Sequence, residues 1–256
     1  MILRRITEHV RTQNWIAIGL DFVIVVVGVF LGIQLGNWNQ AQSDRRDYED
    51  ALARYRTELA TNLATLDTAE SEVSRALTRV GRGIDALLTC DNSEEATILI
   101  EDTLRGAMGT YGLKLRDRAL KTLIETPRLA AQQSPQEREA FNETLYILDV
   151  FLREADFLEV IPLQERLQNN PIIQLGSSSK RSVTYLGQDY SRPERSLELA
   201  VPISEACKDN DLIKSLYTWE RWQSALPAVI RLMRNHLQDD LALLEQIGPT
   251  PDASED

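Results

Sequence analysis

The sequence predicts a mainly α-helical protein: an N-terminal transmembrane helix that continues into an exported helical bundle. Two observations carry this prediction. Residues 16–35 form an almost unbroken apolar run, IAIGLDFVIVVVGVFLGIQL, and about twenty helical residues span roughly 30 Å, the hydrocarbon core of a bilayer. Residues 45–88 lack proline and are rich in Ala, Leu, Glu and Arg, which favour helix.

These features divide the chain into four expected segments. They are a cytoplasmic leader over 1–14, a transmembrane helix over 15–38, an exported helical domain over 39–248 and a disordered acidic tail over 249–256. About two hundred exported residues suffice for one domain with a substantial core.

Two other interpretations of the apolar run stay open. A cleaved signal peptide usually has an apolar region of about 7–15 residues before small residues at the cleavage site, whereas this run is longer and is followed by NWNQAQ. A buried helix of a soluble core would be weakened by about 1 kcal/mol for each of Gly28, Gly32 and Gly36. A retained transmembrane helix fits the run better than either.

The flanking charges predict which side of the membrane each end occupies. Lys and Arg are retained on the cytoplasmic side, and three arginines precede the run: Arg4, Arg5 and Arg11. Arg45 and Arg46, which follow it, are flanked by acids. We therefore expect the N-terminus in the cytoplasm and the C-terminal domain in the periplasm, with Trp15 and Trp38 at the two interfaces.

One face of the predicted membrane helix combines small residues with an acid. Gly28, Gly32 and Gly36 recur every fourth residue, a spacing that lets helix backbones approach closely in lipid. Asp21 lies near the same stripe. Three interpretations of Asp21 stay open: a carboxylate wetted by the inner headgroups, a hydrogen-bonding group that pairs helices, or a proton-carrying site. The stripe predicts a homo-oligomer or a membrane-protein partner.

A family resemblance rests on NW at 14–15, DFVIVVVGV at 21–29 and GNWNQ at 36–40. This stretch resembles the start of a group of uncharacterised bacterial single-pass membrane proteins. They have a basic leader, an acid that opens a Val/Gly-rich helix, and an Asn-Trp-Asn exit. Its members typically carry Glu where this chain has Asp21, which keeps the acid and shortens its reach. The resemblance implies an inner-membrane protein with an exported helical domain, and no established activity.

The segment 45–88 predicts one long helix with an apolar residue at every seventh position: Leu52, Leu59, Leu66, Val73, Val80 and Leu87. A sustained repeat would indicate a coiled coil. The secondary apolar positions change register along the helix, which favours packing inside a bundle, and both interpretations stay open. Gly81 and Gly83 mark a weak point or a close contact near the end of the helix.

Shorter helices are expected after the long one. We predict helices over 93–108 and 113–125, joined by a flexible connection that contains three glycines: Gly106, Gly109 and Gly112. Thr126-Pro127 fits a new N-cap with proline at the first helical position. Residues 134–137, Ser-Pro-Gln-Glu, form a capping box, and the helix that starts there is expected to bend at Pro162.

The segment 170–202 changes character, with glycine, proline and a run of three serines. Three short pieces, 172–175, 182–186 and 197–201, predict a small β hairpin near 172–201. Asn210 is expected to cap a last helical pair, 211–225 and 227–246, which Gly248-Pro249 ends.

Cys90 and Cys207 are the only cysteines of the chain. An even pair in an exported domain predicts one disulfide, which requires Cα atoms within about 7 Å. The alternative is two unpaired small apolar side chains.

The sequence contains no recognisable catalytic or metal-binding motif. His9 and His236 lie on opposite sides of the predicted membrane, and no Cys/His spacing suits zinc. Two acid pairs are expected on solvated helix faces: Glu94-Glu95 and Asp239-Asp240. Four neighbours form either an aromatic ligand wall or, as we favour, core and rim: Tyr217, Trp219, Arg221 and Trp222. We predict no metal and no cofactor.

The formal net charge of −11 argues against nucleic acid as a partner, because a binding face needs clustered Lys and Arg. The sequence predicts a non-enzymatic, single-pass envelope protein that acts as a binding, scaffold or sensor-like module through helix association and its exported domain. The identity of any small ligand stays open. The alternative is an ion- or proton-coupled accessory subunit of a multi-span membrane complex that uses Asp21.

Overall fold

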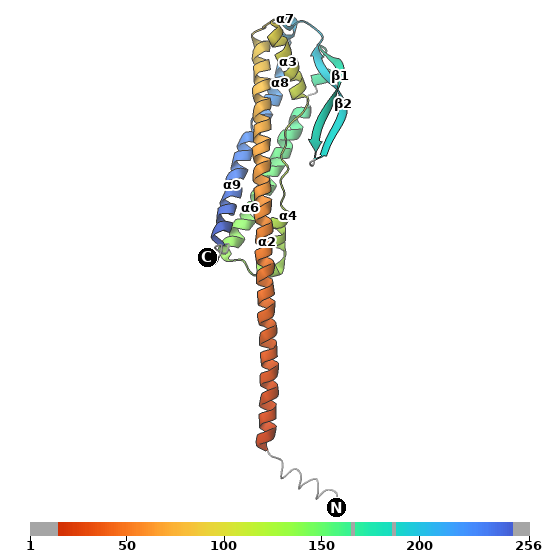
Figure 1. Cartoon of the computed structure of the whole chain (residues 1–256). Coiled ribbons are helices and arrows are strands. Elements are labelled where there is room, and N and C mark those ends of the chain that lie inside the picture. Colours follow the sequence, from red (N-terminus) through yellow and green to blue (C-terminus); the bar gives the residue numbers. More distant parts are fainter. Residues whose placement is uncertain (1–14, 165–166, 186–187, 248–256) are drawn as a thin grey trace, which may run out of the picture.

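The computed structural model describes residues 15–164, 167–185 and 188–247. A single helix of 74 residues, α2 (Trp15–Leu88), runs the length of the molecule (Figure 1). Its N-terminal part stands alone, and its C-terminal part packs within a helical bundle. The predicted mainly α class is therefore confirmed. The expected leader over 1–14 and tail over 249–256 lie outside the described residues.

The bundle surrounds the C-terminal part of α2. The helices that contact α2 include α3 (Glu94–Ala107), α8 (Asn210–Gln223) and α9 (Leu226–Ile247). Another long helix, α6 (Pro135–Val160), packs against α9 and reaches α2 through a hydrogen bond between Tyr48 and Glu137. Shorter elements complete the helical part: α4 (Arg118–Glu125), α5 (Pro127–Ala130), η1 (Ile161–Gln164), η2 (Leu167–Asn169) and α7 (Ile203–Ala206).

The residues of the seven-residue apolar repeat of α2 lie in the core of the bundle. All six positions, from Leu52 to Leu87, are buried. The repeat faces other helices of the same chain, as the bundle interpretation predicts. Residues 48–73 join α4, α6 and α9 in a proximal core. Residues 76–87 join α3, α7 and α8 in a distal core, at the end away from the apolar run.

Local capping signals fix where several helices begin. The Oγ atom of Ser134 accepts a hydrogen bond from the backbone N–H of Glu137, whose carboxylate accepts one from the N–H of Ser134, so the predicted capping box is confirmed. Ser93 caps α3 with its side chain alone, which accepts a hydrogen bond from the backbone N–H of Ala96. At α8 the prediction was off by one residue. Asp209, and not Asn210, accepts from the backbone N–H of Leu212 at 2.7 Å.

The predicted helix over 113–125 is helical only from Arg118, and the predicted flexible connection is a pinned segment. We call residues 108–117 the strap; the segment Thr110–Asp117 has no regular secondary structure. Side chains of α2 and α8 hold its backbone. The Nε1 atom of Trp219 donates to the carbonyl of Gly109 at 2.7 Å, and Asn62 exchanges two hydrogen bonds with the backbone of Arg116. These bonds compete successfully with helix formation.

The predicted hairpin exists and is longer than expected. Strands β1 (Ile173–Tyr185) and β2 (Gln188–Leu199) pair antiparallel, from Ile173 opposite Leu199 to Tyr185 opposite Gln188, with a shift in register between Leu175 and Ser178. Leu197, near the base of the hairpin, is buried in the distal core. The ribbon then runs back along the bundle towards its middle (Figure 1).

Candidate functional site

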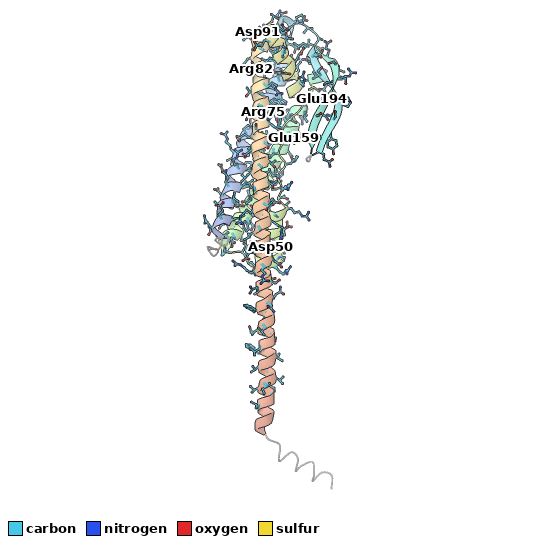
Figure 2. All side chains as sticks on the ribbon, in the orientation of Figure 1. Asp50, Arg75, Arg82, Asp91, Glu159 and Glu194 are labelled. Carbon is cyan, nitrogen blue, oxygen red and sulfur yellow. A yellow bond between two sulfur atoms is a disulfide. The ribbon has the colours of Figure 1, made fainter. Side chains whose placement is uncertain are left out.

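The N-terminal part of α2 has no protein partner in the described part of the chain. Large apolar side chains from Leu20 to Trp38 are 48–69% exposed, and Figure 2 shows them standing away from the bundle. Added Cβ atoms at Gly28, Gly32 and Gly36 would meet nothing within 4 Å. Within the described ranges, α2 is the helix that is long and apolar enough to cross a membrane. The side chains of Trp15 and Asp21 lie outside the described residues.

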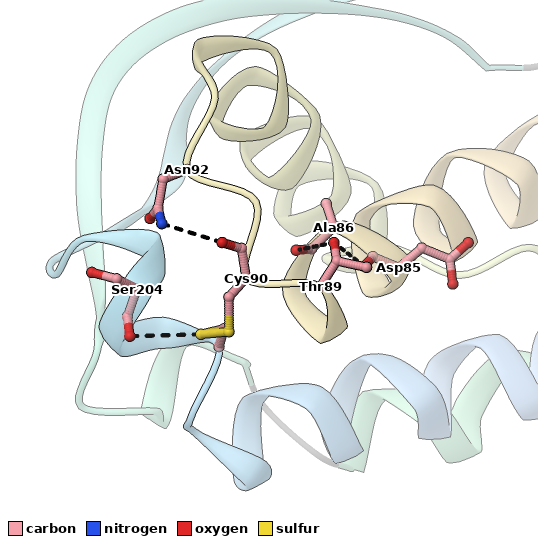
Figure 3. The surroundings of a disulfide bond; sticks show 7 residues. Asp85, Ala86, Thr89, Cys90, Asn92 and Ser204 are labelled. Atoms are coloured by element: carbon pink, nitrogen blue, oxygen red, sulfur yellow. Dashed lines mark hydrogen bonds between the residues drawn. A yellow bond between two sulfur atoms is a disulfide. The ribbon is translucent and has the colours of Figure 1, made fainter.

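A disulfide joins Cys90 and Cys207, as predicted, with Cα atoms 5.3 Å apart. It links the end of α2 to the end of α7 (Figure 3). Cys90 has a positive φ of 50°, and the backbone N–H groups of Cys90 and Asp91 donate to the carbonyls of Leu87 and Ala86. This is the helix end at which glycine is usual. The bridge therefore starts from a tight turn that closes α2.

Two buried tyrosine–carboxylate pairs lie in the proximal core. The Tyr55 hydroxyl donates to Asp240, and the Tyr48 hydroxyl donates to Glu137 at 2.6 Å. Burial, followed by the charge of Asp240, raises the pKa of Tyr55; burial also raises the pKa of Asp240, although the Tyr55 hydrogen bond opposes the rise. Asp240 is only 4% exposed, so the prediction of a solvated Asp239-Asp240 face was wrong for Asp240.

These pairs are suited to packing more than to catalysis. None of Tyr48, Tyr55, Glu137 and Asp240 lines any of the three open clefts described on the protein. In the described part of the chain, every buried side-chain nitrogen or oxygen has a hydrogen-bond partner. The pairs tie α2 to α6 and α9.

The predicted aromatic group near residue 220 divides between core and rim. Trp219 is 2% exposed and Tyr217 is 52% exposed. Trp222 meets Phe157 edge to face, with ring centroids 5.5 Å apart, and the Arg221 guanidinium lies 5.6 Å from the Trp222 ring. The side chains do not form one wall, which agrees with the interpretation that we favoured.

Two clefts of similar size open on the bundle. The distal cleft, about 580 Å³, lies among α2, α3, the strap and the hairpin. It contains four cationic side chains: Arg79, Arg105, Lys180 and Arg195. The lateral cleft, about 560 Å³, lies between α4 and α6 and contains Lys121 and Arg153 with three aspartates. Among the described residues, no group of three or more His, Cys, Asp or Glu side chains is placed to hold a metal ion.

Sequence reasoning did not identify the distal cleft. Its cationic residues come from α2, α3 and the hairpin, which only the tertiary fold brings together. The available signal was local: Lys180, Arg181, Arg192 and Arg195 stand close together in an otherwise acidic chain.

Comparison with known proteins identifies no relative: no family model, no curated protein and no solved structure matches the chain.

Proposed function

We propose that the protein is a single-pass membrane protein of the bacterial inner membrane whose helical domain, held in the periplasm, acts as a non-enzymatic binding or scaffold module. The observation that carries the proposal is the continuity of α2. An exposed apolar segment long enough to span a bilayer passes without a break into the core of the bundle. Such a helix can anchor the protein in a membrane and also support the helical bundle.

The disulfide supports the proposed orientation. Disulfides persist in oxidising compartments such as the periplasm and are rare in the cytosol. The Cys90–Cys207 bridge lies in the domain that follows the apolar segment. The arginines of the leader agree with this orientation, because basic residues remain on the cytoplasmic side.

Membrane insertion and orientation are tested together in bacterial cells that express the full chain. We expect the protein to stay in the membrane pellet after alkaline carbonate washing. In spheroplasts, external protease should digest the domain, and non-reducing gels should show the oxidised form. A soluble protein, or a domain that is protected and fully reduced, would contradict the proposal.

Association through the glycine stripe is tested by crosslinking in membranes. We expect Gly28→Leu combined with Gly32→Leu to lower the yield of crosslinked dimer, or of a crosslinked membrane partner, about tenfold because the backbones can no longer approach. The matched control is Val26→Leu, which lies about 200° around the helix from Gly28 and should leave the yield unchanged. A wild-type protein that crosslinks to nothing would remove this part of the proposal.

The ion-coupled alternative stays a prediction that depends on Asp21. It requires a multi-span partner, because one helix cannot enclose a path for ions. Asp21→Asn should then abolish the activity of the complex while leaving the abundance of the protein unchanged.

A further inference from the structure

The distal cleft differs from the lateral cleft in how its charges are paired. In the lateral cleft, Lys121 lies 2.6 Å from Asp117 and Arg153 pairs with Asp149. The third aspartate there, Asp156, pairs with Lys114. Each charged residue that lines the lateral cleft therefore has an ion-pair partner, and the cleft has no excess of positive charge.

The distal cleft has an excess of positive charge. Glu194 is the one carboxylate among its lining residues, against four cations. Of these cations, Arg105 pairs with Asp102, which does not line the cleft. Arg195 donates only to the carbonyl of Gly176, at 3.3 Å. Arg79 and Lys180 have no side-chain hydrogen bond or ion pair within the described ranges. Like charges gathered in one hollow raise its positive potential and attract anions.

The walls of the distal cleft are held in place by neighbouring elements. Two side chains of α8 hold the strap in place. The Nε1 atom of Trp219 donates to the carbonyl of Gly109, and the Oε1 atom of Gln223 accepts from the backbone N–H of Tyr111 at 2.8 Å. Trp219 and Gln223 are themselves buried. On the facing hairpin, the register shift between Leu175 and Ser178 lies at the cleft. Such bulges redirect side chains.

The cleft also has space and further donors. A Cβ atom added at Gly109 would meet nothing within 4 Å. The hydroxyl-bearing residues Thr110, Ser177 and Ser179 line the same hollow. A volume of about 580 Å³ lies in the range of small-molecule sites. Guanidinium groups bind carboxylate and phosphate oxygens in pairs, which suits a ligand that carries several anionic oxygens.

We propose that the distal cleft is a binding site for a small multivalent anion, one that carries two or more phosphate or carboxylate groups. The binding step is non-covalent: Arg79, Lys180 and Arg195 supply the charge and the neighbouring hydroxyl groups supply directed hydrogen bonds. The site does not depend on membrane orientation, so it goes beyond the proposed anchoring function. Figure 2 shows Glu194 on the hairpin and Arg75 and Arg82 on α2 in the same distal half of the molecule.

The test is isothermal titration calorimetry on the full chain in non-ionic detergent, with inorganic pyrophosphate and citrate as probes. We expect one of them to bind with a Kd on the order of 1 mM or tighter at low salt. Arg79→Gln and Lys180→Gln should each weaken binding about tenfold, the size of one charge-assisted hydrogen bond. Glu194→Gln should strengthen it, because it removes the opposing charge.

Two controls separate a built site from diffuse attraction. Arg82→Gln removes an exposed arginine of α2 that does not line the cleft, and it should change Kd less than about twofold. Gly109→Leu fills the cleft without changing charge and should weaken binding of both anions. An equal loss in Arg82→Gln, or no effect of Gly109→Leu, would overturn the site.

The two probes also identify the chemistry of the ligand. A preference for pyrophosphate of about tenfold or more indicates a phosphate-bearing ligand, and the same preference for citrate indicates a carboxylate-bearing one. If neither anion binds at about 10 mM, the proposal is wrong, whatever the membrane assays show.

Discussion

At the scale of single residues, the two buried tyrosine–carboxylate pairs behave differently. Burial acts to raise the pKa of Glu137, but hydrogen bonds from Ser134 and Tyr48 outweigh it and the pKa is lowered. For Asp240, burial outweighs the hydrogen bond from Tyr55, and the pKa is raised. Glu137 therefore stabilises the fold above its ordinary pKa, and this contribution is lost as pH falls through its lowered pKa. Asp240 stabilises the fold in acid, and this contribution is lost as pH rises through its raised pKa.

Replacement of Tyr55 by Phe tests the role of Asp240. A raised folded-state pKa means that stability falls as pH rises from the ordinary carboxyl pKa through the raised one. Without the Tyr55 hydroxyl the pKa of Asp240 rises further. We expect Tyr55→Phe to cost about 1–3 kcal/mol at neutral pH, and less in acid where the carboxyl is protonated. Urea unfolding midpoints from about pH 4 to about pH 8 measure both effects.

The control for this variant is Tyr146→Phe. Tyr146 lies on α6 and is 62% exposed, so removal of its hydroxyl should change stability by less than about 0.5 kcal/mol at every pH. A Tyr55→Phe variant whose cost does not change with pH would contradict the assignment of the raised pKa to Asp240.

At the scale of elements, α2 and α3 approach each other closely at Gly83. A Cβ atom at Gly83 would lie 2.0 Å from the Oγ1 atom and 2.6 Å from the Cβ atom of Thr103. Thr103 is itself fixed, since its hydroxyl donates to the carbonyl of Arg79 at 3.1 Å. Gly83 therefore marks a close contact, one of the two interpretations that the sequence left open.

Alanine substitutions at two glycines of these helices should have opposite effects. Gly83→Ala should destabilise the protein by about 1–3 kcal/mol, because the overlap forces α2 and α3 apart. At Gly106 of α3, the nearest atom to an added Cβ is 3.7 Å away on Arg79, an ordinary contact. Gly106→Ala should stabilise by up to about 1 kcal/mol through helix propensity. Thermal and urea unfolding of both variants check the signs, and a stabilising Gly83→Ala would contradict the close contact.

At the scale of the whole molecule, the disulfide closes a loop between residues 117 apart in sequence. Chain-entropy estimates assign about 4–5 kcal/mol to such closure, although measured gains are often smaller. We expect Cys90→Ser combined with Cys207→Ser to lower the urea midpoint. Cys90→Gly combined with Cys207→Ser should lower the midpoint less. The difference in the free energy of unfolding between the two variants should be about 1 kcal/mol, because glycine adopts the positive φ at position 90 without strain. Equal midpoints for all three proteins would contradict both statements.

The sequence predicted those features that depend on nearby residues or on a strict period. The repeat from Leu52 to Leu87, the capping box at Ser134 and the apolar run are of this kind. The strap could not be predicted, because its partners Asn62, Trp219 and Gln223 lie about fifty or more residues away. The full length of the hairpin could not be predicted, because most of its paired residues are polar. They lack the alternation of apolar and polar residues by which a strand is recognised in a sequence. Pro193 fits because a two-stranded ribbon has only edge strands.

The continuity of α2 has a mechanical consequence. From Trp38 to Leu88 the helix rises by about 75 Å at 1.5 Å per residue, and it contains no joint that could absorb a change of angle. In a bilayer, a tilt of about 20°, the average for transmembrane helices, would displace the far end of the bundle sideways by roughly 25 Å relative to an upright helix. Rotation of the segment in lipid would turn the distal cleft by the same angle. In a membrane, movement of the apolar segment would therefore displace the far end of the bundle with it, because one unbroken helix joins the two.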